Sequence, residues 1–289
     1  LNFTNPAGIN TESVIKHSKI KSVGLCNVPI GMIMEVIKYF GGEVSDIELD
    51  YVGLNHLSWV RQFKKAGQDI TPEVLDKFCE HARDEWEEEA TRDNMVKAIR
   101  SLNMFCNYYL QYFYSTDTVL KTAQGKTQTR GEEVVEIENA LFKKYQDPNL
   151  SEKPEELGKR GGAHYSTAAF HLVDGIENDR QNRQIVCCRN NGAVPTFDDD
   201  VAVEVSAIVG KEGARAIQQE APDHQIRGLM QLIKNYESLT VEAAVTGDRE
   251  AGLHALLTNP LAPPNIDLCK QLLDDVLEIN KEHLQDTFF

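Results

Sequence analysis

The stretch SVGLCNVPIGMIMEVIKYFGG (residues 22–42) carries the pattern that decides the fold class. Its first five residues are a short, mostly apolar run, which predicts a buried strand. The run VPIGMIMEVIKYF (28–40) that follows has the composition of a helix, and Gly41 and Gly42 end it. The stretch therefore predicts one strand followed directly by one helix.

The residues upstream repeat this order. LNFTNPAGI (1–9) predicts the end of a strand that runs into a helix, with Asn5 as the capping residue and Pro6 in the first turn. The first 45 residues thus alternate strand and helix, as in the last part of an α/β unit.

Beyond residue 45, strands and helices fall into separate blocks. Alternating apolar and polar residues predict strands over 47–64, and β-branched runs predict strands over 184–189 and 201–209. The ranges that predict helices are 72–91, 129–145, 223–247, 248–257 and 265–284, and the range that predicts a polar surface loop is 147–162. Because the strands form two groups among many helices, we expect an α+β fold.

Composition excludes several classes of protein. The 289 residues include 30 basic and 45 acidic side chains, a net charge of -15, which excludes a uniformly basic nucleic-acid surface. No apolar run approaches the length of a membrane span. The six cysteines contain no C-x-x-C pair, which argues against a zinc-ribbon or thioredoxin-type site. A low cysteine content in a long acidic chain is typical of the reducing cytoplasm, where we expect this protein to reside.

Cys26 and His56 are candidate ligands of one metal ion. Cys26 ends a predicted strand and begins a helix, where backbone N–H groups and the helix dipole stabilise a thiolate, a soft metal ligand. His56, in GLNHLSW (53–59), also follows a predicted strand. The alternative is an inert buried cysteine and a structural histidine, and spacing alone does not decide between them.

The aromatic run NYYLQYFYSTD (107–117) contains a candidate general base. Tyr109, Tyr112 and Phe113 can share one helical face, and a core stripe is the alternative interpretation. A tyrosine, with a pKa of about 10, acts as a base near neutral pH only beside a positive charge. Arg130, which opens the next predicted helix, is the candidate cation, and a solvated surface arginine is its alternative role.

Eight segments in order resemble the NAD- and metal-dependent glycosidases of glycoside hydrolase family 4, in particular its 6-phospho-β-glucosidases. The segments are TNPAGI (4–9), GLCNVPIG (24–31), GLNHLSW (53–59), YLQYFYSTD (109–117), TRGEEVVEIE (129–138), KRGGAHYS (159–166), RNNGAV (189–194) and TGD…TNPL (246–261). Each segment is unspecific alone, but the ordered set covers nearly the whole chain.

The resemblance also implies a domain organisation. Family members begin with a Rossmann domain that bears a G-x-G-x-x-G fingerprint, which this sequence lacks. Residues 1–45 are then the C-terminal remnant of the dinucleotide-binding domain, and residues 46–289 are a substrate- and metal-binding domain similar to the C-terminal domain of lactate dehydrogenase. The resemblance further implies that these 289 residues are a fragment without activity of its own.

Residue roles follow from the matched segments. Cys26 and His56 match the ligands of a divalent metal ion, usually Mn²⁺, and Tyr109 matches the base. Tyr108 is the alternative base, because NYYLQ is one residue longer than the usual lead-in. The positions matching substrate contacts are Asn5, Asn27, Asn55 and Arg130.

The resemblance also implies a reaction sequence. In the family, NAD takes a hydride from sugar C3, and the tyrosine then takes the C2 proton. The glycosidic oxygen leaves, water adds and the ketone is reduced, so the route needs no carboxylate pair.

Asn27 bears on specificity. Family members that act on α-linked sugars tend to carry Asp after the metal-binding cysteine, whereas an amide cannot serve as an acid, which favours a β-linked substrate. The resemblance implies a phosphorylated disaccharide substrate and a homo-oligomer, a dimer or tetramer. Three other functions stay open: a 6-phospho-α-glucosidase or α-galactosidase of the same family, a non-catalytic metal- or sugar-phosphate-binding module, and a dehydrogenase domain, which would not need the Cys26/His56 pair.

Overall fold

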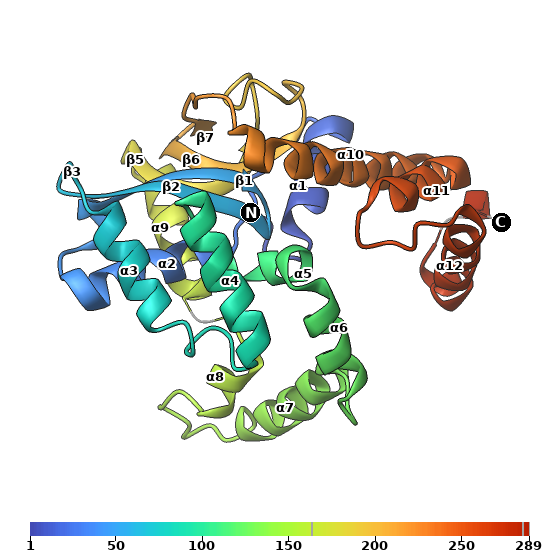
Figure 1. Ribbon diagram of the computed structural model, residues 1–289, viewed down its shortest axis with the longest axis horizontal. Coiled ribbons are helices and arrows are strands. Elements are labelled where there is room, and N and C mark those ends of the chain that lie inside the picture. The colour runs from blue at the N-terminus through green and yellow to red at the C-terminus, as the bar shows by residue number, and fades with distance from the viewer. Residues whose placement is uncertain (163, 285, 289) are drawn as a thin grey trace.

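Two antiparallel sheets, which lie against each other through β1 and β6, form the centre of the molecule (Figure 1). The computed structural model describes residues 1–162, 164–284 and 286–288. One sheet contains β1 (Ile47–Leu54), β2 (Leu57–Lys65), β3 (Gln68–Asp69) and β4 (Phe105–Cys106), and the other contains β5 (Asn182–Arg189), β6 (Ala202–Gly210) and β7 (Gly213–Ala216). Across the interface, the Ser206 hydroxyl donates to the Leu49 carbonyl at 2.9 Å. The strands expected over 47–64, 184–189 and 201–209 are confirmed, whereas the expectations missed β3, β4 and β7.

The hairpin of β1 and β2 has a two-residue loop. Leu54 pairs with Leu57, so only Asn55 and His56 lie between the strands. Gly53 makes this tight turn possible, because a Cβ there would lie 2.3 Å from the Leu57 carbonyl oxygen. The hairpin therefore presents Asn55 and His56 at its tip.

The N-terminal segment differs from the expectation of two strands. Gly24 forms a single β-bridge to Asn2 on one side and another to Cys187 of β5 on the other. These bridges do not extend into a strand, because the chain enters α2 three residues later. A Cβ at Gly24 would lie 2.3 Å from the Thr11 hydroxyl, so only glycine permits this close packing. Asn5 does not cap the first helix as expected: Pro6 is its N-cap residue, without a side-chain hydrogen bond.

Helices surround the sheets and extend beyond them. They are α1 (Ala7–His17), α2 (Asn27–Phe40), α3 (Thr71–Glu80), α4 (Glu89–Leu102), α5 (Gln111–Tyr114), α6 (Thr116–Gln124), α7 (Arg130–Lys144), α8 (Glu156–Arg160), α9 (Tyr165–Glu177), α10 (His224–Thr246), α11 (Arg249–Thr258) and α12 (Ile266–Ile279). Figure 1 shows α2, α3, α4 and α9 beside the sheets, whereas α7 and α12 lie at the periphery. The expected α+β class is confirmed.

The expectation of a single helix over 72–91 is wrong, because two helices, α3 and α4, cover this range. The chain breaks between α3 and α4, where the Glu88 carboxylate accepts hydrogen bonds from the first turn of α4 and Trp86 is buried. The expected loop over 147–162 contains the short helix α8.

Residues 1–45 share one core with the rest of the chain. Leu25 and Val36 belong to the same buried cluster as Trp59 and Val203. The domain division at residues 45 and 46 stays a prediction. In the part of the chain that the structure describes, no helix is both long and apolar enough to cross a membrane.

Candidate metal and substrate site

Cys26 lies at the N-terminus of α2, where it is the N-cap residue and only 3% exposed. Burial, and secondarily the charge of Glu204, raise the pKa of its thiol to about 12. The backbone N–H groups of Asn27 and Val28 and the side chain of Asn55 donate hydrogen bonds that lower this pKa, but they do not outweigh burial. The helix start thus stabilises the thiolate as expected, but burial outweighs this effect, and a bound cation would have to supply the difference.

His56 has the neutral form that metal coordination needs. Burial lowers the pKa of its imidazole to about 4, so the ring is uncharged near neutral pH. Its backbone adopts φ 64°, in the left-handed region that few non-glycine residues occupy. This conformation lies at the tip of the hairpin, where the imidazole stacks on Tyr109 with ring centroids 4.0 Å apart.

Asn55 connects the two candidate ligands. Its Oδ1 accepts the Ala7 N–H at 3.1 Å, its Nδ2 donates to Glu204 Oε1 at 3.0 Å, and the amide also hydrogen-bonds the Cys26 sulfur. The residue that bonds the Cys26 sulfur is therefore the chain neighbour of His56. Asn55 was expected to bind substrate, but its amide is 8% exposed and bonded to protein groups.

Tyr109 also belongs to this site. It lies in a 3₁₀ turn, Tyr108–Leu110, where the Asn107 side chain accepts the Tyr109 N–H at 3.0 Å. Burial raises the pKa of the Tyr109 phenol, and the charge of Cys26 raises it further, which places the two groups within electrostatic range. The Tyr108 ring packs on Tyr109, with centroids 4.3 Å apart.

Arg130 pairs with residues of α7 and α8 and not with Tyr109. Its guanidinium donates to Glu133 Oε2 at 2.7 Å and to the Lys159 carbonyl at 2.7 Å, and α7 lies away from the hairpin tip in Figure 1. The expectation that Arg130 lowers the pKa of Tyr109 is wrong, because burial raises that pKa and Arg130 is not among the groups that shift it.

Asn5 meets a residue that the sequence reasoning missed. Its Nδ2 donates to the Tyr165 hydroxyl at 3.4 Å. Burial raises the pKa of Tyr165, and the charges of Cys26 and Tyr109 raise it further. Tyr165 therefore faces the site from the start of α9. The signal was present in KRGGAHYS (159–166), a matched segment to which no residue role had been assigned.

A cavity beside α2 offers room for a sugar. Its volume is about 570 Å³, and its lining includes Asn27, Tyr108 and His164. The Asn27 Oδ1 lies 4.0 Å from the Cys26 sulfur. The cavity therefore reaches the position next to the candidate metal ligand.

The donor set fits a divalent cation with open positions. Cys26 offers a sulfur and His56 a neutral nitrogen. Across residues 1–162, 164–284 and 286–288, no cluster of three or more His, Cys, Asp or Glu side chains could hold a metal ion. A cation held by two protein ligands keeps positions for oxygens of a substrate or water, as catalytic sites require.

Comparisons with known proteins point to one family. The model of the "Family 4 glycosyl hydrolase" matches residues 1–41, and that of the "Family 4 glycosyl hydrolase C-terminal domain" matches residues 51–262. A probable 6-phospho-beta-glucosidase of Bacillus subtilis is 38% identical over 100% of this chain and 66% of its own length. The 6-phospho-beta-glucosidase BglT of Thermotoga maritima is 36% identical over 99% of this chain and 67% of its own length.

A solved structure agrees with the sequence relatives. The 6-phospho-beta glucosidase from Thermotoga maritima with manganese, NAD+ and glucose-6-phosphate superposes with a TM-score of 0.86 at 34% identity, covering 98% of this chain and 66% of that one. The chain thus spans about two thirds of the length of the relatives it matches.

Proposed function

Because this chain belongs to the family 4 glycosyl hydrolases, we propose that it forms the metal- and sugar-binding part of an NAD- and Mn²⁺-dependent 6-phospho-β-glucosidase. The observation that carries the proposal is the stacking of Tyr109 on His56, which joins the candidate base to a candidate metal ligand. Two relatives bear the name of this activity, and a solved relative holds manganese, NAD+ and glucose-6-phosphate.

Cys26 and His56 would hold the Mn²⁺ ion. When bound, the ion withdraws electrons from sugar oxygens and so acidifies the neighbouring C–H group. Cys26 gives up its proton on binding, whereas His56 is already neutral. Asn27, beside Cys26, and Asn5, which hydrogen-bonds Tyr165, would offer their amides to sugar hydroxyls.

Tyr109 is the proposed base that accepts the proton from sugar C2. Its ring contacts His56, whereas the Tyr108 ring packs behind it on Tyr109. Burial raises the pKa of Tyr109, so the phenolate that accepts this proton would need a nearby positive charge, which a bound metal ion would supply. The stacking on His56 favours Tyr109, whereas Tyr108 lines the cavity of about 570 Å³ and stays the alternative base.

The proposal commits to β-linked substrates. The side chain after Cys26 is the amide of Asn27, which cannot serve as an acid, and the two relatives compared above are named β-glucosidases. The chain contains no G-x-G-x-x-G fingerprint, and none of its residues is proposed to bind NAD.

Binding to the 289-residue chain tests the sugar and metal roles. Isothermal titration of glucose 6-phosphate with and without Mn²⁺ is expected to show tighter binding with the ion. Equal binding in both conditions would contradict a shared metal and sugar site.

Turnover tests the linkage. The assay uses a chimera in which the part of the Thermotoga maritima relative that this chain does not match precedes the chain, and the intact relative is the positive control. With NAD and Mn²⁺, hydrolysis of cellobiose 6-phosphate and not of its α-linked analogue is expected. Preference for the α-linked sugar would favour the 6-phospho-α-glucosidase alternative.

We also propose a homo-oligomer in the cytoplasm. The exposed apolar side chains of α12 support an interface between copies of the chain; they are Leu268, Leu272, Val276 and Ile279. All six cysteines are free thiols, which fits a reducing compartment. Light scattering with Leu272→Glu is expected to yield a smaller species than the unchanged chain.

A further inference from the structure

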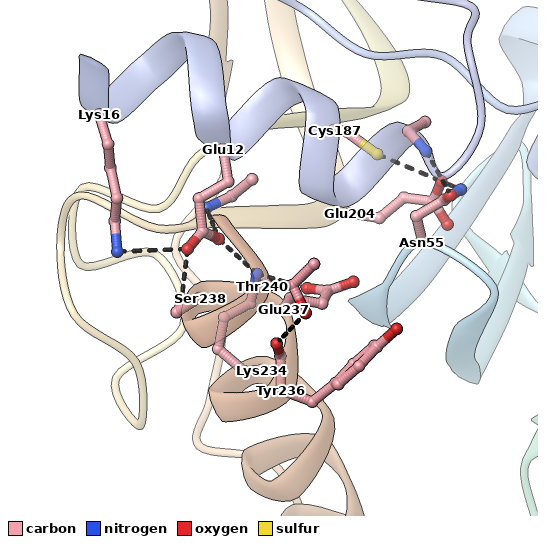
Figure 2. Close-up of polar contacts among 12 residues, drawn as sticks. Glu12, Lys16, Asn55, Cys187, Glu204, Lys234, Tyr236, Glu237, Ser238 and Thr240 are labelled. Atoms are coloured by element: carbon pink, nitrogen blue, oxygen red, sulfur yellow. Dashed lines mark hydrogen bonds and ion pairs between the residues drawn. The ribbon is translucent and has the colours of Figure 1, made fainter. Parts of the chain in front are cut away.

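A buried carboxylate on β6 occupies the centre of the polar network beside α1 (Figure 2). Glu204 is 1% exposed. Its Oε2 accepts from the Tyr51 hydroxyl at 2.6 Å, its Oε1 accepts from Asn55 Nδ2 at 3.0 Å, and the Cys187 thiol lies 3.6 Å from Oε1. Burial raises the pKa of Glu204 to about 6, so the fold retains a carboxylate that is costly to bury.

Glu204 determines which way the Asn55 amide faces. An ionised carboxylate only accepts hydrogen bonds, so the amide must turn its nitrogen to Glu204. Its oxygen then accepts the Ala7 N–H on the other side, at 3.1 Å. The second N–H of the amide is left for the sulfur of Cys26, where a hydrogen bond stabilises the thiolate.

We propose that Glu204 is a positioning residue of the metal centre, which fixes the Asn55 amide so that the Cys26 sulfur and the His56 imidazole are held for a divalent cation. This inference rests on the metal site of the proposed function. Partners behind the ligands orient them and tune the affinity of many metal sites. The carboxylate charge, together with the Cys26 thiolate, also offsets the two positive charges of the ion.

Ser206 is a matched control for a purely structural role. It lies two residues along β6, so its side chain is on the same face of the sheet, and it is 4% exposed. Its hydroxyl donates to the Leu49 carbonyl, so the bond that Ser206→Ala removes leads to β1 backbone instead of Asn55.

The test is the Mn²⁺ affinity of the 289-residue chain, measured by isothermal titration. In Glu204→Gln, the side chain loses its negative charge and one of its two acceptor oxygens, so its hold on the Asn55 amide is weakened. We expect the Mn²⁺ dissociation constant to rise by about 10–100-fold. Ser206→Ala is expected to change it by less than about twofold, and thermal unfolding without metal monitors the fold of each variant.

A double-mutant cycle separates positioning from a long-range charge effect. If Glu204 acts through Asn55, then Glu204→Gln changes the Mn²⁺ affinity by less than about threefold when Asn55→Ala is already present. An undiminished effect in that background would overturn the route through Asn55. If Glu204→Gln does not fold, Glu204→Asp takes its place, because its shorter side chain withdraws the carboxylate from Asn55 and should weaken binding in the same direction.

The outcomes distinguish this inference from the proposed function. Failure of the unchanged chain to bind Mn²⁺ would overturn both. Binding by the unchanged chain with the same affinity in Glu204→Gln as in Ser206→Ala would overturn only the role of Glu204.

Discussion

The imidazole of His56 stacks on the phenol of Tyr109, with ring centroids 4.0 Å apart and an angle of 27° between the planes. One residue comes from the tip of the β1–β2 hairpin and the other from the turn before α5. The contact therefore fixes the candidate base relative to a candidate metal ligand without any sequence proximity between them.

Replacement of Tyr109 by Phe tests the role of its hydroxyl. In the chimera, Tyr109→Phe is expected to slow exchange of the sugar C2 proton by about 10²–10⁴-fold, because a positioned base contributes that much. Binding of glucose 6-phosphate should change little, since the ring that stacks on His56 remains. Tyr108→Phe is the control, and a larger loss in that variant would identify Tyr108 as the base.

Replacement of the two ligands tests the metal centre. Cys26→Ser and His56→Gln should each abolish measurable Mn²⁺ binding by calorimetry, because each removes one of two protein donors. In a metal-loaded crystal, the Cys26 sulfur and the nearest His56 nitrogen should lie about 3–5 Å apart, as ligands of one ion do. Cys79→Ser, in α3, is the matched thiol control, and equal loss in that variant would contradict the assignment.

Arg130→Ala tests whether this arginine recognises phosphate. We expect it to weaken glucose 6-phosphate binding far more than glucose binding, because a guanidinium can bind phosphate oxygens through two N–H groups. The variant should change stability little, since the pair of Arg130 with Glu133 is exposed. Equal loss for both sugars would show that the phosphate is bound elsewhere.

A buried ion cluster joins α1 to α10 (Figure 2). Lys234 lies 2.7 Å from Glu12 and 2.6 Å from Glu237, and all three side chains are buried. Glu12→Gln leaves Lys234 paired with Glu237 but removes the charged acceptor of the hydrogen bonds from Lys234 and Ser238, so the free energy of unfolding is expected to fall by about 1.5–3 kcal/mol. Urea unfolding measures it, with Glu80→Gln of an exposed pair as the control.

The same cluster predicts a pH dependence. Burial acts to raise the pKa of Glu12, but the charge and hydrogen bond of Lys234 and the hydrogen bond of Ser238 outweigh it and lower that pKa below 4.5. A carboxyl with a lowered folded-state pKa stabilises the protein above its unfolded value and loses this contribution as the pH falls through the folded value. As the pH falls below 4.5, Glu12→Gln should therefore lose less stability than the unchanged chain. An identical loss in both proteins would show that Glu12 is not the source of the acid sensitivity.

Local pattern predicted most elements because their causes are local. The alternation over 47–64 predicts strands, as observed in β1 and β2, and Gly41 ends α2 as expected. The break between α3 and α4 was missed because it depends on the burial of Trp86 against the core. Tyr165 was missed for a similar reason: its contact with Asn5 spans 160 positions of the chain.

The sequence by itself determined the chemical character of the site: a thiol, an imidazole and a phenol in segments that resemble one family. Only the tertiary structure decided their state, because burial raises the pKa of Cys26 and lowers that of His56, and burial depends on the whole fold. The tertiary structure likewise placed Glu204 behind Asn55, 149 positions away in the chain, and kept Arg130 away from Tyr109. Which charges meet is set by how sheets and helices pack, and no local pattern encodes it.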